Sequence, residues 1–274
     1  MPIWPRPSMH CWPRPPDKAC FPADFPYNSG TMLFLRSSLF HAGMITVVVV
    51  GSFVVVLCRP FLRFERRFVL ASWFTRGVMW WLGVTCGLKH RFEGMENIPD
   101  GPVIFFAKHQ SAWETFALQS YLPPFFWILK REVMWIPIFG WGIATLNPIA
   151  IDRSAGRAAV EQIVLQGTAR LERGWRVMIF PEGTRIATGD TRRFGMGGAV
   201  LAQKSGCPVV PIAHDSGSFW VRRGFHKKAG TIRVVIGEPF CTTGLSPDDI
   251  NAKAKTWIDT TTAALEQSEE TPGS

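Results

Sequence analysis

Two N-terminal segments differ in how hydrophobic and polar positions are arranged. Residues 37–58 contain no Asp, Glu, Lys or Arg, and a helix of this length reaches about 33 Å, enough for a bilayer core. A buried core helix is the alternative interpretation of such an apolar run. Residues 60–88 instead interleave arginines with aromatic side chains, which is typical of a helix lying in the membrane interface. Together the two segments predict an N-terminal two-helix membrane motif.

From about residue 90, short apolar runs alternate with longer stretches of helical pattern. The pattern predicts strands at 103–107, 125–129, 148–151, 177–180, 209–213 and 231–236. It predicts helices at 112–121, 154–173 and 197–204, and a last helix from a Ser246 N-cap to about Gln267. The alternation predicts an α/β fold in which helices flank a mostly parallel or mixed sheet.

The chain is expected to divide into four parts. Residues 1–31 hold eight of the 21 prolines and no long apolar run, so we expect a disordered Pro-rich tail rather than a secretory signal. A proline-rich ligand segment for a partner is the alternative. Residues 32–88 would be the membrane-anchoring helices, residues 89–267 a globular domain and residues 268–274 a flexible C-terminus.

Charge and aromatic content point to an anionic partner. Lys and Arg number 30 against 21 Asp and Glu, for a net charge of +9, which suits nucleic acid, a membrane surface or a phosphorylated substrate. The chain holds 12 Trp and 2 Tyr, and Trp favours the membrane interface. Because the basic-aromatic segment directly follows a membrane-length apolar run, anionic membrane lipids are the expected partner and nucleic acid is not.

The distribution of arginine also predicts an orientation. The 20 residues after position 58 hold five Arg, whereas the 20 residues before position 37 hold only Lys18 and Arg36. The positive-inside rule therefore places the C-terminal domain in the cytoplasm. The six cysteines form no CxxC pair, so neither a disulfide framework nor a metal site is expected.

The end of the predicted strand 103–107 carries a possible catalytic pair. Functional sites in open α/β sheets form beyond the carboxyl ends of strands. His109 in the strand–helix turn can reach Glu114 in the first helical turn, and a carboxylate that holds one imidazole nitrogen leaves the other as a base. The alternative is a capping box in which Ser111 is the N-cap and Glu114 lies at N3. Both roles are compatible only if Glu114 divides its hydrogen bonds.

Two other strand ends carry groups suited to a phosphate. The turn after residue 180 holds Glu182, Gly183, Thr184 and Arg185, which combine exposed amides, a hydroxyl and a guanidinium. An ordinary loop is the alternative interpretation. Arg153 follows another predicted strand, as a phosphate clamp or as part of a surface ion pair. The chain contains no GxxxxGK[ST], GxSxG or HExxH motif.

Four segments in this order resemble the motif blocks of the glycerolipid acyltransferase family. They are residues 108–114, 140–153, 180–185 and 209–213, and the resemblance extends over about residues 32–265. Within the family, the sequence most resembles the bacterial enzymes that make phosphatidic acid. One position departs from the usual first block, His-x4-Asp, because Glu114 stands where aspartate is usual.

The resemblance implies a role for each candidate residue. His109 would deprotonate the free sn-2 hydroxyl of lysophosphatidic acid, which attacks an acyl thioester, and Glu114 would orient His109. The phosphate site would comprise Arg153, Glu182, Gly183, Thr184 and Arg185. The strand behind the site and the wall of the acyl-chain site would comprise Val209, Val210, Pro211, Ile212 and Ala213. No metal and no cofactor is implied beyond acyl-CoA or acyl carrier protein (acyl-ACP) as co-substrate.

The resemblance also implies a location and leaves two alternative functions open. We expect a protein of the bacterial inner (cytoplasmic) membrane whose acyltransferase catalytic domain, residues 89–267, faces the cytoplasm. The first alternative is acyl transfer to another lyso-lipid, such as a lyso-ornithine lipid or a lysophospholipid. The second is a basic membrane-binding protein without catalysis.

Overall fold

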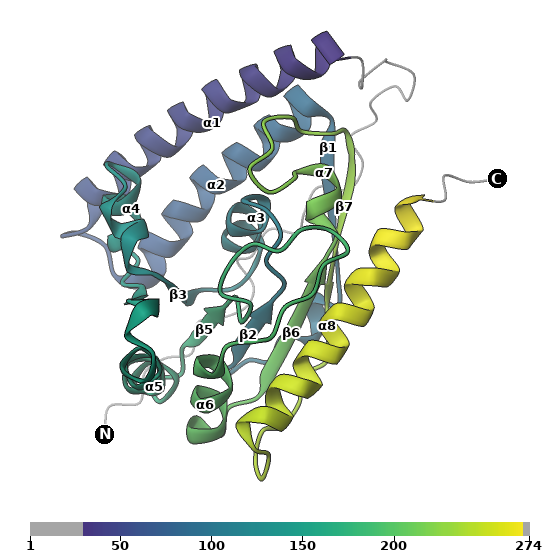
Figure 1. The fold of residues 1–274 in the computed structure, drawn as a ribbon. Helices are drawn as coiled ribbons and strands as arrows, with labels where there is room; N and C mark the ends of the chain where they lie inside the picture. The colour runs from purple at the N-terminus through teal and green to yellow at the C-terminus, as the bar shows by residue number, and fades with distance from the viewer. Residues whose placement is uncertain (1–29, 271–274) are drawn as a thin grey trace.

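One mixed sheet of seven strands lies at the centre of the computed structural model, which describes residues 30–270 (Figure 1). The strand order is β1-β7-β6-β2-β5-β3-β4. Neighbouring strands are parallel except β6 and β7, which are antiparallel. The strands are β1 (Leu88–Glu93), β2 (Ile104–Ala107), β3 (Phe125–Lys130), β4 (Ile149–Ile151), β5 (Arg176–Ile179), β6 (Val209–His214) and β7 (Gly230–Ile236). The predicted α/β fold with a mostly parallel, mixed sheet is confirmed.

Helices cover both faces of this sheet. The helices are α1 (Gly30–Cys58), α2 (Phe64–Cys86), α3 (Trp113–Tyr121), α4 (Phe139–Ala144), α5 (Arg157–Leu171), α6 (Met196–Ser205), α7 (Ser216–Phe219) and α8 (Pro247–Glu270). Short 3-10 turns lie at Met95–Asn97, Arg131–Trp135 and Arg153–Ala155. α1, α2 and α3 stack on one face, and α5, α6 and α8 pack on the other (Figure 1).

Side chains of the central strands point alternately to the two faces of the sheet, and each face has its own hydrophobic cluster. Phe105 and Ala107 of β2 face the cluster shared with α2 and α3, whereas Ile104 and Phe106 face the cluster shared with α5, α6 and α8. All four side chains are fully buried. Strands covered on both faces have continuous apolar sequences, which is why the central strands were recognisable in the sequence.

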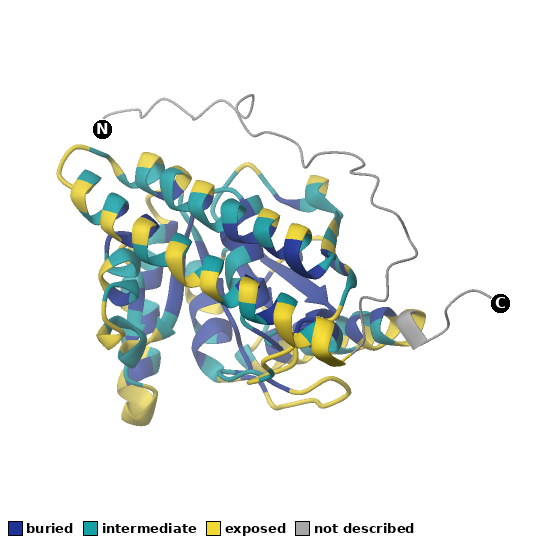
Figure 2. Ribbon diagram, turned by 90° about the horizontal axis from the view of Figure 1, so that it is seen from above, coloured by how far each residue is buried: buried dark blue, intermediate teal, exposed yellow. Residues whose placement is uncertain are grey.

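The N-terminal helices α1 and α2 pack closely on each other. A Cβ at Gly43 would overlap the Trp81 indole, and one at Gly51 would lie 2.6 Å from Phe74. Phe40 of α1 is fully buried in the same hydrophobic cluster as the sheet. The outward side of the pair presents mainly exposed and partly exposed positions (Figure 2). The two predicted helices are therefore present and share a core with the rest of the chain.

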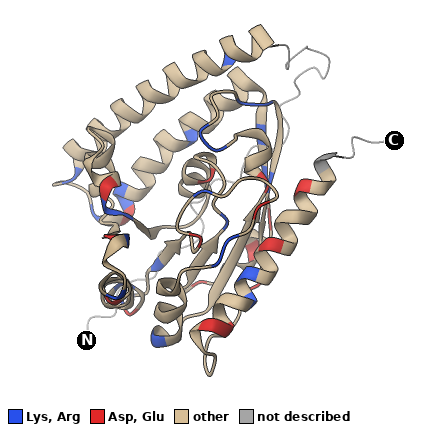
Figure 3. Cartoon of the chain, in the orientation of Figure 1, with Lys and Arg blue, Asp and Glu red and all other residues tan. Residues whose placement is uncertain are grey.

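Helix α1 is also the element that bears on membrane association. Among the helices of residues 30–270, it is the one that is long and apolar enough to cross a membrane. In its most apolar stretch of 18 residues, 17% of the residues are buried. Most of its exposed side chains are apolar, including Leu35, Ile45 and Leu57 at 57, 58 and 70% exposure. Arg36 is the single charged residue of α1 (Figure 3). This composition indicates association with a membrane.

Several boundaries differ from the sequence-based expectations. β1 was not predicted, because it pairs with β7 alone at the sheet edge and alternates with charged residues. The helix predicted at 154–173 is divided, because Gly156 takes a left-handed φ of 52° between a 3-10 turn and α5. The four-part division of the chain stays a prediction, and residues 1–29 and 271–274 of its two tails lie outside the described residues.

The close approach of α1 to α2 can be tested by adding one methyl group. We expect Gly43→Ala to destabilise the helix pair by about 1–3 kcal/mol, because the indole of Trp81 must move. Gly77→Ala on α2 is the control, since its Cβ would meet nothing nearer than 3.8 Å. Thermal unfolding in detergent compares the two variants. Equal stability of both would contradict the described packing.

Candidate active site

His109 and Glu114 meet at the carboxyl end of β2. His109 lies in the turn that follows the strand, and Glu114 lies in the first turn of α3. The His109 Nδ1 and Glu114 Oε1 atoms are 2.8 Å apart. The Glu114 side chain is 0% exposed and that of His109 is 14% exposed. The predicted pairing is therefore present, with the carboxylate buried behind the imidazole.

The Glu114 carboxylate also accepts hydrogen bonds from the turn around it. The backbone N–H groups of Gln110 and Ser111 each donate over 2.8 Å, and the Ser111 hydroxyl over 2.7 Å. The Ser216 hydroxyl of α7 donates over 3.1 Å. Ser111 Oγ in turn accepts from the backbone N–H of Trp113, whereas the N-cap of α3 is Ala112, which makes no side-chain cap hydrogen bond. Glu114 therefore divides its bonds between His109 and the Ser111 turn, but the predicted capping box with Ser111 as the N-cap is replaced by the bonds that join Ser111 to Glu114 and Trp113.

These bonds decide the charge of Glu114. Burial by itself raises the pKa of this carboxyl, but the hydrogen bond from His109, the positive charges that His214 and His109 carry when protonated in acid, and the Ser111 hydroxyl outweigh burial and lower the pKa to about 2. The carboxylate is therefore ionised at neutral pH and can only accept hydrogen bonds. It follows that His109 Nδ1 carries the proton, so the neutral imidazole has its lone pair on Nε2.

The imidazole of His109 is also fixed from its other sides. It stacks on the Phe180 ring, with centroids 4.0 Å apart and planes 11° from parallel. Its backbone N–H donates to Glu182 Oε2 over 2.8 Å, and its carbonyl accepts from Ile186 N over 2.7 Å. The loop after β5, which contributes Phe180, Glu182 and Ile186, thus holds both the ring and the backbone of His109.

Glu182 is held in a buried ion pair. Its Oε1 lies 2.8 Å from Lys108 Nζ, and the two side chains are 0% and 2% exposed. Lys108 Nζ also lies 3.3 Å from Asp259 of α8. Burial lowers the pKa of Lys108, but the charges of Glu182 and Asp259 outweigh burial and raise it. Glu182, predicted to bind phosphate, does not line the cavity described below and instead supports His109.

His214 supports the same turn from the end of β6. It is fully buried, and burial lowers its pKa, so its imidazole is neutral. Nε2 donates to the Lys108 carbonyl over 2.9 Å, and Nδ1 accepts from Ser216 N over 3.4 Å. His214 therefore holds the turn that carries His109.

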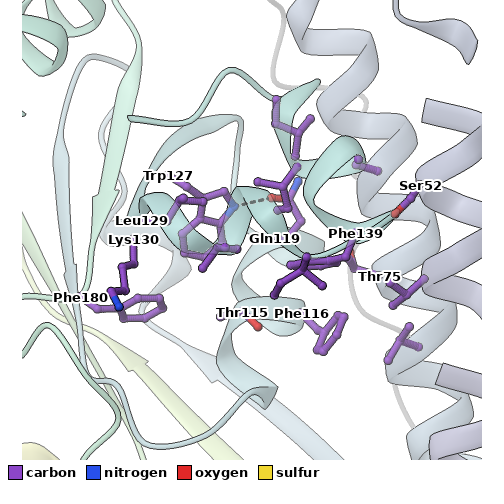
Figure 4. Close-up of a pocket in the computed structure, with 18 of the residues that line it drawn as sticks. Ser52, Thr75, Thr115, Phe116, Gln119, Trp127, Leu129, Lys130, Phe139 and Phe180 are labelled. Atoms are coloured by element: carbon purple, nitrogen blue, oxygen red, sulfur yellow. Dashed lines mark hydrogen bonds between the residues drawn. The ribbon is translucent and has the colours of Figure 1, made fainter. Parts of the chain in front are cut away.

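A cavity of about 480 Å³ opens beside His109. Its apolar walls come from α1, α2, β3 and α4, and include Val48, Val55, Phe74, Trp127, Phe139 and Ile143. Figure 4 shows this lining, with Gln119 of α3 bonded to the Trp127 indole N–H over 2.9 Å. The five residues 209–213, expected as an acyl-chain wall, lie in β6, which pairs with β2 in the sheet, and they do not line this cavity.

Cationic and amide groups surround the polar end of the cavity. Arg153, Gly183, Thr184 and Arg185 all line it, as does His109. Gly183 has a φ of 72°, and a Cβ there would lie 3.9 Å from Arg153 Nη1, so the loop and this guanidinium are neighbours. The structure thus brings four of the five predicted phosphate-binding residues to one surface beside His109.

Some residues of the site were missed in the sequence. Lys130, Arg222 and Arg223 also line the cavity, and Lys and Arg positions cluster in the loops of this region (Figure 3). Asp259 lies 151 residues after Lys108, and no sequence motif predicts that the two side chains meet. Within residues 30–270, no three His, Cys, Asp or Glu side chains come together as a metal site.

Comparisons with known proteins agree on one family. The acyltransferase family profile matches residues 89–215. A 1-acyl-sn-glycerol-3-phosphate acyltransferase of Pseudomonas aeruginosa is 41% identical over 85% of this chain and 89% of that protein. One of Saccharomyces cerevisiae is 30% identical over 68% of this chain and 63% of that protein. The crystal structure of 1-acyl-sn-glycerophosphate acyltransferase from Thermotoga maritima shares the fold, with a TM-score of 0.72 and 22% sequence identity. The match covers 89% of this chain and 99% of that one.

The low pKa of Glu114 predicts a pH-dependent contribution to stability. The folded pKa of about 2 lies below the ordinary 4.5, so this stabilisation is complete above about pH 4.5 and is lost as the pH falls towards 2. We expect the stability advantage of the wild type over Glu114→Gln to shrink over this range in denaturant titrations. Glu161→Gln, an exposed position of α5, is the control. A pH-independent difference for Glu114→Gln would contradict the assignment.

Proposed function

This chain belongs to the family of 1-acyl-sn-glycerol-3-phosphate acyltransferases, and we propose that His109 is the base with which it acylates lysophosphatidic acid to phosphatidic acid. The observation that carries this proposal is the 2.8 Å bond from His109 Nδ1 to the buried Glu114 carboxylate. That bond leaves Nε2 as the basic nitrogen of a side chain that lines the cavity.

The transfer is a direct attack by the acceptor on the acyl thioester. His109 Nε2 takes the proton from the sn-2 hydroxyl of lysophosphatidic acid as its oxygen bonds to the thioester carbonyl carbon. The resulting tetrahedral intermediate collapses, the carbon–sulfur bond breaks, and the sulfur leaves with the proton returned by His109. Glu114 stabilises the imidazolium that exists between the two proton transfers, as the carboxylate of a Ser-His-Asp triad does.

The acceptor phosphate fits the polar end of the cavity. Arg153 and Arg185 supply two guanidinium groups, which suit phosphate oxygens through charge-assisted hydrogen bonds. Gly183 and Thr184 bring a turn with a left-handed residue and a hydroxyl to the same end. Glu182 acts indirectly, because it holds the backbone N–H of His109. A phosphate bound here would place the neighbouring glycerol hydroxyl beside His109.

The apolar part of the cavity suits a fatty acyl chain. Its walls come from helices α1, α2 and α4 and from strand β3, so the chain would lie between the helix pair and the sheet. Trp127 of β3 and Phe74 of α2 are among the apolar side chains that would contact it. Residues 209–213 would serve as the strand behind the catalytic turn.

The same helix pair would bring the enzyme to its substrate. Lysophosphatidic acid resides in membranes, and the exposed apolar surface of α1 suits burial in lipid. The arginines after residue 58 favour a position on the cytoplasmic side, where acyl-CoA and acyl-ACP are available. We therefore assign the enzyme to the bacterial inner membrane, with anionic lipids as surface partners and the catalytic domain facing the cytoplasm.

The proposal is tested by acyl transfer with purified membranes, lysophosphatidic acid and an acyl thioester. We expect His109→Ala to lower kcat by about 10²–10⁴-fold, which is the usual contribution of a general base. The phosphatidic acid product is measured by chromatography. His226→Ala, at an exposed histidine of the loop before β7, is the matched control and should retain the wild-type rate.

Two results would each contradict a different part of the proposal, namely the identity of the base or the identity of the acceptor. A near-normal rate in His109→Ala would rule out His109 as the base. Acylation of another lyso-lipid, without formation of phosphatidic acid by the wild type, would retain the mechanism but reject the acceptor.

A further inference from the structure

A second cavity, of about 560 Å³, adjoins the one that His109 lines. It begins at the residues next to the catalytic loops, since Gln110 follows His109 and Ile186 follows Arg185. The rest of its lining comes from residues 187 and 188, 217–219, 221, 222, 228, 229 and 266. Arg222 lines both cavities, so the two spaces meet at this side chain.

The proposed reaction requires room for two long substrates at one base. The first cavity provides apolar walls for an acyl chain and a phosphate site around Arg153 and Arg185. The acyl thioester carries a further phosphate, which is separated from its sulfur by the pantetheine arm. That arm must reach His109 without displacing the acceptor phosphate, so it needs a separate approach to the catalytic turn.

The lining of the second cavity suits such an arm. Pantetheine contains two amides and a hydroxyl, and the cavity presents the hydroxyl groups of Thr188 and Ser218. Arg222 and Lys228 add two exposed cations, which suit a phosphate.

The one carboxylate among the described residues of this lining, that of Glu266, is hydrogen-bonded to other groups of the protein. Glu266 of α8 accepts hydrogen bonds from Gln110 Nε2 over 2.6 Å and from Gly189 N over 3.2 Å. The same Gln110 side chain accepts from Gly217 N over 3.2 Å. These bonds fix the inner end of the cavity and leave Arg222 and Lys228 as the charged groups at its exposed side.

Given the acyltransferase activity proposed above, on which this inference rests, we propose that the second cavity binds the phosphopantetheine arm shared by acyl-CoA and acyl-ACP. Arg222 and Lys228 contact the phosphate of the arm, and the thioester reaches His109 where the two cavities meet. The acceptor and the donor therefore approach the base from different cavities and are bound by different arginines.

The test compares three donors with the wild type and the variant Lys228→Ala, because Lys228 lines the second cavity but not the first. The donors are acyl-CoA, acyl-ACP and an acyl-pantetheine that lacks the phosphate. We expect the KM for both phosphorylated donors to rise roughly tenfold or more in the variant, as for loss of a charge-assisted contact. The KM for lysophosphatidic acid, kcat, and the kcat/KM for acyl-pantetheine should stay unchanged. Lys204→Ala, exposed at the end of α6, is the control.

Three outcomes would overturn the inference while the acyltransferase function stands. They are an unchanged KM for the phosphorylated donors, a rise confined to acyl-CoA, and a rise in the KM for lysophosphatidic acid instead. An equal loss with acyl-pantetheine would likewise reject contact with the phosphate. Absence of acyl transfer by the wild type with any donor would instead reject the proposed function itself.

Discussion

The geometry of the site depends on the buried carboxylate of Glu114. A fully buried carboxylate costs several kcal/mol unless hydrogen bonds replace its water, and here the donors come from His109, from the Gln110–Ser111 turn and from Ser216. These groups belong to the end of β2, the start of α3 and the start of α7, so satisfying the charge brings three elements together. The same bonds set the tautomer of His109, which leaves Nε2 as the nitrogen on which its proposed role as a base rests.

Two further arrangements surround His109 with the groups that the proposed function assigns to substrate binding. The loop after β5 supports His109 through Phe180 and Glu182, and its next residues, Gly183 and Arg185, line the cavity. The helix pair α1–α2 shares a core with the sheet and also forms the apolar walls of this cavity. The polar end of the cavity and its apolar walls therefore lie together, because the N-terminal helices and the turn that carries His109 pack on the same face of the sheet.

The sequence predicted those features that depend on local pattern. The central strands were predicted because they are apolar on both faces, and the spacing of His109 and Glu114 allowed both a pair and a capping box. Spacing alone cannot show that one carboxylate bonds both His109 and the Ser111 turn, or that Ala112 becomes the N-cap, because these bonds depend on packing. The edge strand β1, the buried contact of Lys108 with Asp259 and the cavity walls were missed, because each joins residues distant in sequence.

The most direct test of the account is the tautomer of His109, measured by ¹⁵N NMR of the imidazole near neutral pH. The account predicts a protonated Nδ1, hydrogen-bonded to Glu114, and an unprotonated Nε2 available as the base. Glu114→Gln should weaken this preference, because the neutral amide holds the Nδ1 proton less strongly than the carboxylate does. A wild-type imidazole protonated at Nε2 and bare at Nδ1 would contradict the account.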